Sequence, residues 1–333
     1  MQNKRNLEVL KVILELSQNA DLKVFVVGGA VRDLILLKQK AEAMTISSGQ
    51  NLLPKINLPD VDLLMNSDIY EFSEVLVKNH LCKVKIHKQF LTAKLEFSDG
   101  LSFDLVQTRS ESYLNSGSLP IVEAGNFDTD TKRRDFTVNT LKIALEDFVD
   151  CIANDLPLAK VKSAVIDHSQ GLRDLEQGFI RTLHVESFRD DPTRIFRALR
   201  YKGRLNGQLE EQTRTQLHLA VKNQYLNNIS EVRVLNELIK IIAEPSFEKI
   251  KIDFEIFSLA INHIFTAKDL ELLRLKRSLK QPQQVLSREE TMILLLSALG
   301  IEKAEEIFLR MQIAKELRKK LITNHKQDQG SAQ

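Results

Sequence analysis

The two halves of this chain carry different hydrophobic periods. In the first 150 residues, β-branched runs alternate with amphipathic segments, which predicts a mixed α/β part. Strands are expected over 23–27, 60–65, 83–87, 92–97 and 101–107. From about residue 170 onward these signals fade, and a period of 3.6 residues predicts helices, among them 192–205, 210–222 and 230–243. The expected fold class is therefore α+β.

Composition and charge restrict the class of protein and the compartment in which we expect it. The chain has 333 residues, of which 43% are hydrophobic and 28% charged, as expected for a folded protein with a sizeable core. The net charge of +2 gives no global attraction to nucleic acid, so any basic surface must be local. The N-terminus lacks an apolar signal region, and no apolar run is long enough to span a bilayer. Two cysteines are too few for a disulfide framework, which fits a reducing compartment. We therefore expect a cytoplasmic protein without a membrane role. No protein partner is predicted.

A glycine pair stands where the first predicted strand runs into a helix. Gly28 and Gly29 leave room for an anion beside backbone N–H groups, and the helix N-terminus and Arg32 add positive charge. A phosphate group would fit this corner. The alternative is an ordinary tight turn, and the third glycine of a dinucleotide fingerprint is missing.

Two aspartates open the next predicted strand. Asp60 and Asp62 are two residues apart, so both carboxylates project from one face of a strand and can share a hard cation. Asp104, on a later predicted strand, is a candidate third carboxylate. The alternative is a solvated strand start. A phosphate-binding corner followed by such a pair is what metal-assisted nucleotidyl transfer requires.

Between these two motifs, the segment 39–58 contains Pro54 and a Ser-Ser-Gly sequence, and Pro59 follows it. It is expected to be a loop insertion that begins after a helix ending near Lys38.

Two further segments combine arginine with aspartate. In 132–140, Arg134 could balance a triphosphate and Asp135 could accept a hydrogen bond from a ribose hydroxyl. In 188–204, Asp191 stands before a proline that suits a helix start. A stripe of arginines follows at helical spacing, formed by Arg194, Arg197, Arg200 and Arg204. An anionic partner would suit this stripe, although solvated basic faces are also common.

Taken in order, these segments resemble the motifs of the class II tRNA nucleotidyltransferase and bacterial poly(A) polymerase family. The matching segments are 28–33, 60–62, 133–139 and 191–200, and 229–233 resembles a later motif. Single motifs are weak evidence, but four in the family's order are specific. The stretches 107–113 and 117–120 resemble the branch that includes stand-alone A-adding enzymes.

The resemblance implies a polymerase-β-like nucleotidyltransferase head over 1–150. It also implies a helical neck that selects the nucleotide over 151–245, and a helical, tRNA-binding body and tail over 246–333. Asp60 and Asp62 would bind Mg²⁺, with Asp104 as the candidate third catalytic residue. The nucleotide would be bound by Gly28, Gly29, Arg32, Arg134, Asp135, Asn139, Asp191, Arg194, Arg197 and Arg200.

The function implied is template-independent addition of CMP, AMP or both to the tRNA 3′ end, using CTP or ATP and Mg²⁺. On the neck helix, a carboxylate would accept a hydrogen bond from the exocyclic amine that C and A share, and a guanidinium would donate to their ring acceptors. U and G present the opposite groups and would be rejected. Two alternatives are a poly(A) polymerase acting on general RNA and a catalytically inactive tRNA-binding relative. Both aspartates are present, which weighs against loss of activity.

Overall fold

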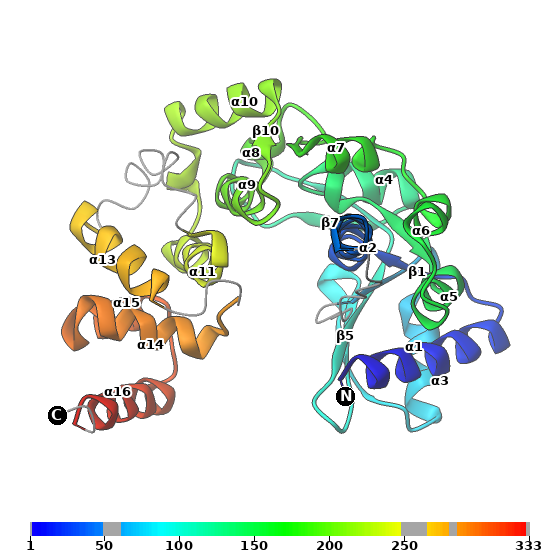
Figure 1. Ribbon diagram of the computed structural model, residues 1–333, viewed down its shortest axis with the longest axis horizontal. Coiled ribbons are helices and arrows are strands. Elements are labelled where there is room, and N and C mark those ends of the chain that lie inside the picture. The colour runs from blue at the N-terminus through cyan, green and yellow to red at the C-terminus, as the bar shows by residue number, and fades with distance from the viewer. Residues whose placement is uncertain (1, 49–60, 248–264, 280–284, 331–333) are drawn as a thin grey trace. The chain divides into compact units, whose positions relative to one another are not determined.

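The computed structural model describes residues 2–48, 61–247, 265–279 and 285–330 (Figure 1). Two compact units are present. The first comprises Met1–Ser112, Pro120–Gln177 and Arg181–His184, and the second comprises Tyr113–Leu119, Gly178–Ile180 and Val185–Gln333. The α+β fold class is confirmed. The proposed limits of head, neck and body remain predictions.

A six-stranded sheet forms the centre of the first unit. Its strand order is β3-β4-β5-β2-β1-β8. The pairing of β2 with β5 is parallel and the other pairings are antiparallel. The strands are β1 (Val24–Val27), β2 (Asp62–Met65), β3 (Lys83–His87), β4 (Thr92–Glu96), β5 (Ser102–Gln107) and β8 (Lys142–Ala144). All five strands expected from the first part of the sequence are therefore present.

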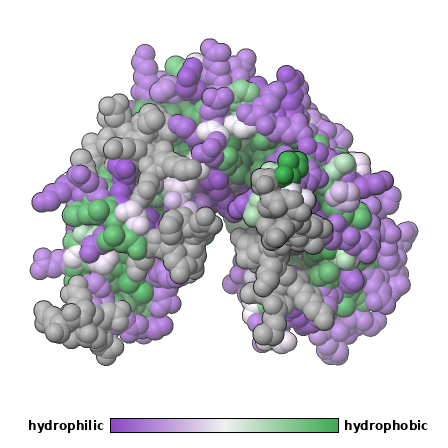
Figure 2. All heavy atoms as spheres, viewed as in Figure 1, coloured by the Kyte–Doolittle hydropathy of each residue, from purple (hydrophilic) through white to green (hydrophobic). Residues whose placement is uncertain are grey.

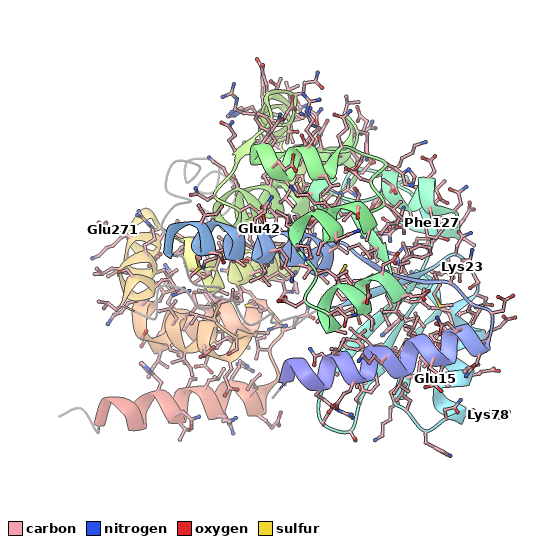
Figure 3. The ribbon with its side chains drawn as sticks, turned by 45° about the vertical axis from the view of Figure 1, so that its right-hand side comes forward. Glu15, Lys23, Glu42, Lys78, Phe127 and Glu271 are labelled. Atoms are coloured by element: carbon pink, nitrogen blue, oxygen red, sulfur yellow. The ribbon has the colours of Figure 1, made fainter. Side chains whose placement is uncertain are left out.

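One face of this sheet is buried beneath helices. α1 (Gln2–Asn19) packs on α3 (Ile69–Lys78) and α5 (Leu145–Ala153), and the latter two contact the strands. Leu63 of β2, Leu95 of β4 and Leu105 of β5 are fully buried on this side. Charged residues such as Glu15 and Lys78 lie on the outside of the helices (Figure 3). Because side chains alternate along a strand, the polar residues of β2, β4 and β5 share the opposite face.

Smaller elements complete the first unit. They are α2 (Gly29–Ser48), β6 (Arg109–Ser112), β7 (Ile121–Ala124), α4 (Phe127–Lys132), the 3₁₀ turn η2 (Thr137–Asn139), α6 (Leu158–Ala164) and α7 (Gly171–Gln177). β6 and β7 form a separate antiparallel ribbon. The ring of Phe127 packs edge-on against Phe25 at 4.9 Å, which attaches α4 to the polar face of the sheet.

The expectation of a loop beginning after Lys38 is wrong. α2 continues to Ser48 because its second half is anchored by tertiary contacts that local sequence does not show. Ala41 is buried where α2 packs on α6, and Lys38 forms an ion pair with Asp155 at 2.5 Å. Residues 49–58 lie outside the described residues.

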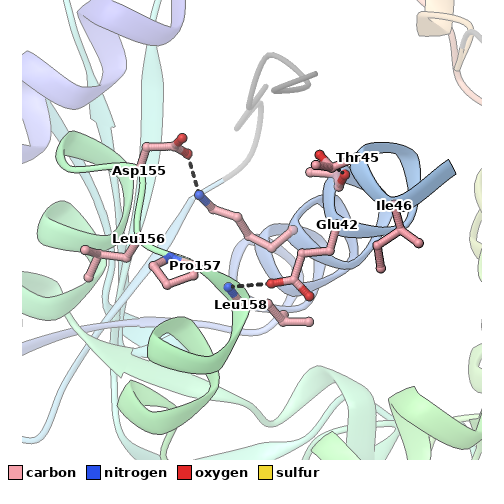
Figure 4. A pocket seen from close by; sticks show the side chains of 9 residues that line it. Glu42, Thr45, Ile46, Asp155, Leu156, Pro157 and Leu158 are labelled. Atoms are coloured by element: carbon pink, nitrogen blue, oxygen red, sulfur yellow. Dashed lines mark hydrogen bonds and ion pairs between the residues drawn. The ribbon is translucent and has the colours of Figure 1, made fainter. Parts of the chain in front are cut away.

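A cavity of about 390 Å³ lies beside this contact (Figure 4). The Glu42 carboxylate accepts a hydrogen bond from the Leu158 N–H at 3.2 Å, and the Asp155 carboxylate forms the ion pair with the Lys38 ammonium. None of the predicted site residues lines this cavity.

The second unit is mainly helical. Its helices are α8 (Ser187–Asp190), α9 (Thr193–Arg204), α10 (Glu211–Lys222), the 3₁₀ turn η3 (Tyr225–Asn228), α11 (Glu231–Ala243), α13 (Ala267–Ser278), α14 (Arg288–Leu299), α15 (Ile301–Arg310) and α16 (Lys315–Gly330). The helices expected over 192–205, 210–222 and 230–243 are confirmed. A short parallel pair, β9 (Phe179–Ile180) and β10 (Gln208–Leu209), was not expected, since two residues show no period.

Hydrophilic residues predominate on the face of the molecule shown in Figure 2. No helix in the described ranges combines the length and the apolar character that a membrane crossing requires.

Candidate active site

The sheet register brings two of the predicted carboxylates together. Asp62 of β2 stands directly beside Asp104 of β5 in the parallel pair. In-register residues of neighbouring strands point to the same face, with strands about 4.8 Å apart. Asp60 lies outside the described residues, so its predicted role remains a prediction. The candidate third carboxylate of the sequence is therefore the direct neighbour of Asp62.

Both aspartates line a cavity of about 310 Å³ on the open face of the sheet. The other lining residues include three arginines from outside the sheet, Arg109, Arg133 and Arg134. Carboxylate oxygens are the ligands that Mg²⁺ prefers, so Asp62 and Asp104 have the donor chemistry for this ion. Among the described residues no group of three His, Cys, Asp or Glu side chains forms a metal site.

The glycine corner lies at the edge of this arrangement. Gly28 has φ +74°, which a side chain would strain, and its N–H donates to the Leu141 carbonyl at 2.8 Å. A Cβ there would lie 3.4 Å from the Asn139 carbonyl oxygen and 3.6 Å from Nη1 of Arg134. The tertiary structure thus brings the first and third sequence motifs together.

A buried hydrogen-bond chain links these motifs. Arg32 is 2% exposed, and its guanidinium donates to the Asn139 side-chain oxygen and to Asp33 at 2.7 Å. Asn139 in turn donates to Asp135 at 3.0 Å, which also accepts from the Phe136 N–H at 2.8 Å. Arg32, Asp135 and Asn139 therefore hold one another in place. Their contacts with a nucleotide remain predictions.

The arginines of the cavity are held by two acids that the sequence analysis missed. One oxygen of Asp130 accepts from Arg134 at 2.8 Å and the other accepts from Arg133 at 2.7 Å. Glu111 accepts from Arg133 at 3.0 Å and from Arg109 at 2.8 Å. Spacings of three and four residues between Asp130 and the arginines were a usable signal, since such residues meet on one helix face.

The electrostatics of this cluster follow from its burial. Asp130 is 2% exposed. Burial alone would raise its pKa, but the charges of Arg134 and Arg133 and their hydrogen bonds outweigh burial, so the pKa of Asp130 lies below its usual value. Burial and the charge of Arg133 lower the pKa of Arg109, against the opposing effect of Glu111. The cluster is a compact network with three guanidinium groups facing the carboxylate pair.

One glycine outside the motifs fixes the position of the turn that carries Asn139. A Cβ on Gly171 of α7 would lie 2.3 Å from the Thr137 carbonyl oxygen, so the backbone of η2 would have to move. We predict that Gly171→Ala lowers the free energy of unfolding by about 1–3 kcal/mol. Urea unfolding measures this effect. Arg173→Ala, an exposed change on the same helix, is the control, and equal behaviour of the two variants would contradict the prediction.

The second unit holds the remaining predicted residues near the start of α9. One oxygen of Asp191 accepts from the Thr193 hydroxyl at 2.7 Å and from Arg233 of α11 at 2.9 Å. Arg194 is buried and donates to the Ser187 hydroxyl at 2.7 Å. Arg233 belongs to the segment 229–233 singled out in the sequence, which is thereby shown to contact the 191–200 segment.

The arginine stripe of α9 is partly balanced by an acid from elsewhere in the sequence. Arg200 and Arg204 lie 3.9 and 3.8 Å from the Glu244 carboxylate, which follows α11 and is 2% exposed. Arg197 and Arg200 also lie over the Tyr201 ring, at 5.6 and 5.1 Å from its centroid. Periodicity could not reveal Glu244, because only the packing of α11 on α9 brings it there.

Comparison with known proteins places this geometry in context. Residues 24–181, the region of the sheet, the cavity and the arginine cluster, match the model of the poly A polymerase head domain family.

Curated relatives extend the match beyond the head. The chain is 35% identical over 236 residues to an A-adding tRNA nucleotidyltransferase of Geobacter sulfurreducens, an alignment covering 71% of this chain and 23% of the relative. It is 32% identical over 236 residues to the A-adding tRNA nucleotidyltransferase of Halalkalibacterium halodurans, covering 70% of this chain and 48% of the relative. The alignments thus span less than half of each relative's length. Other relatives are named as CC-adding and CCA-adding enzymes.

A solved structure resembles most of the chain. It is a tRNA nucleotidyltransferase in complex with a primer tRNA and an incoming ATP analogue, with a TM-score of 0.64 and 25% identity, covering 93% of this chain and 82% of that one.

Proposed function

We propose that this chain, whose residues 24–181 match the poly A polymerase head domain family, adds AMP to the 3′ end of tRNA without a nucleic-acid template. The observation that carries the proposal is the pairing of Asp62 with Asp104 in one cavity with Arg109, Arg133 and Arg134. Carboxylates that can hold metal ions beside cations that can hold phosphates are the two requirements of nucleotidyl transfer.

The roles of the head residues follow from their chemistry. Arg134, beside the glycine corner, would bind the triphosphate, and the Arg32–Asn139–Asp135 chain would keep that corner in shape. Asp62 and Asp104 would hold Mg²⁺, which when bound polarises the phosphate and lowers the pKa of the attacking hydroxyl. The protein itself would contribute mainly position and charge, because phosphoryl transfer needs little covalent help.

Base selection would belong to the second unit. Asp191 and Arg194 would read the base, with Arg197 and Arg200 beside the nucleotide. Asp191 is oriented by Arg233, and Arg194 by Ser187, so both side chains are fixed before a nucleotide arrives. Preorganised hydrogen-bonding groups can reject a wrong base, because that base would leave them unpaired.

AMP is favoured over CMP by two observations. Two relatives, at 35% and 32% identity over 236 residues, are named A-adding enzymes, and the stretches 107–113 and 117–120 resemble that branch. The chain is proposed to act in the cytoplasm, on tRNA ending in CC and with ATP as the donor.

An acceptor panel tests this proposal. The purified chain is given labelled ATP or CTP, Mg²⁺, and tRNA transcripts that lack CCA, end in CC or end in CCA. We expect AMP incorporation into the CC-ended tRNA alone. Incorporation of CMP would show that the chain is a CC-adding or CCA-adding enzyme and not an A-adding one. Equal labelling of arbitrary RNA would favour a poly(A) polymerase, and no incorporation into any acceptor would overturn the enzymatic proposal.

A further inference from the structure

The open face of the sheet carries a row of in-register residues that crosses four strands. Asp62 of β2 pairs with Asp104 of β5, Asp104 pairs with Lys94 of β4, and Lys94 pairs with Lys85 of β3. Cross-strand partners in register project from the same face, so two carboxylates are followed by two ammonium groups. Lys94 also lines the cavity that holds both aspartates.

The two lysines form an unfavourable pair in the protein alone. Both are exposed, and like charges directly opposite each other on neighbouring strands destabilise a sheet. The next pair along the same face differs, since Lys83 stands opposite Glu96, a residue of opposite charge. Within the described residues neither Lys85 nor Lys94 takes part in an ion pair. An anion placed over both would relieve their repulsion.

The geometry of the reaction indicates which anion arrives there. The glycine corner and Arg134 lie on the β1 side of the carboxylates, whereas β4 and β3 lie on the other side. In nucleotidyl transfer the attacking and leaving oxygens are roughly in line. The 3′-oxygen bonds to the α-phosphorus while the bond to the bridging oxygen breaks and pyrophosphate leaves. If pyrophosphate departs toward the glycine corner, the attacking 3′-hydroxyl must come from the side of β4 and β3.

We propose that Lys94 and Lys85 bind the last internucleotide phosphates of the RNA acceptor and so present its 3′-hydroxyl to the carboxylate pair. This inference rests on the proposed nucleotidyl transfer and adds to it the path of the acceptor strand. The site is electrostatic, since a lysine ammonium contacts phosphate without reading the base.

The test is a binding measurement that does not depend on turnover. Fluorescence anisotropy gives the Kd of a labelled CC-ended tRNA acceptor-stem hairpin for the wild type and for the double variant Lys85→Gln/Lys94→Gln over a range of salt concentrations. We expect the double variant to bind on the order of tenfold more weakly, with the slope of log K against log [salt] reduced by about 1.4. In turnover assays, its KM for RNA rises while its KM for ATP is unchanged.

A chemical change in the RNA identifies the contact. A hairpin whose last two linkages are uncharged methylphosphonates should bind the wild type as weakly as the normal hairpin binds the double variant, and should bind both proteins equally. Lys83→Gln is the matched control and should retain wild-type affinity. The inference would be overturned if the neutral linkages weakened RNA binding by the same factor in the wild type and in the double variant. It would also be overturned if the double variant kept the salt slope of the wild type. Failure of the proposed function itself would appear separately, as a wild type that incorporates no nucleotide.

Discussion

Replacing Asp62 with asparagine is expected to reduce nucleotide incorporation by at least about 10³-fold while leaving RNA binding nearly unchanged. Asparagine keeps the size of the side chain but removes the charge that would hold Mg²⁺ beside Asp104. Single-turnover incorporation into CC-ended tRNA measures the loss, and fluorescence anisotropy measures RNA binding. Asp104→Asn should cause a loss of similar kind, since the two residues line the same cavity.

Glu96→Gln provides the matched control for this prediction. Glu96 is an exposed carboxylate on the same sheet face, but it does not line the cavity. Its variant should incorporate nucleotide like the wild type. Wild-type turnover by Asp62→Asn would exclude Asp62 from the metal site, whereas an inactive Glu96→Gln would mean that the sheet face tolerates no loss of charge.

The second large effect concerns the acid beneath the arginine cluster. We expect Asp130→Asn to lower the free energy of unfolding by about 3–5 kcal/mol, because it leaves two partly buried guanidinium groups without their shared carboxylate. Nucleotide affinity should fall as well, since Arg134 would lose the contact that orients it. Urea unfolding and ATP titration measure the two losses.

The contribution of Asp130 to the free energy of unfolding should decrease as the pH falls. Its pKa is lower in the folded protein, so its charged form stabilises the fold at and above its ordinary pKa of about 4. That stabilisation is lost as the pH falls through the lowered value. The difference in stability between wild type and Asp130→Asn should therefore be full at neutral pH and shrink in strong acid.

Asp128→Asn, on the same helix, is the control for both measurements. Its ion pair with Lys132 joins side chains that are 67% and 71% exposed, and such surface pairs contribute little to stability. An Asp130→Asn variant as stable as this control would show that the positions of Arg133 and Arg134 do not depend on Asp130.

The strands and the start of α2 were predictable because local patterns determine them. A two-residue period marks a half-buried strand, and Asp99-Gly100 suits the turn between β4 and β5, where Gly100 has φ +84°. The end of α2 was not predictable, because Ala41 and Lys38 are anchored by α6 and Asp155, which follow more than a hundred residues later.

The sequence by itself determined the chemistry available to this protein: a glycine corner, aspartates on strands and arginines at helical spacing, whose order along the chain indicated the family. Only the tertiary structure decided which of these groups meet. The parallel pairing of β2 with β5 sets Asp104 beside Asp62, and chain folding brings Glu111 to Arg133 and Glu244 to α9. The physical reason is that periodicity reports which face a residue occupies, whereas strand register and helix packing depend on contacts between distant segments.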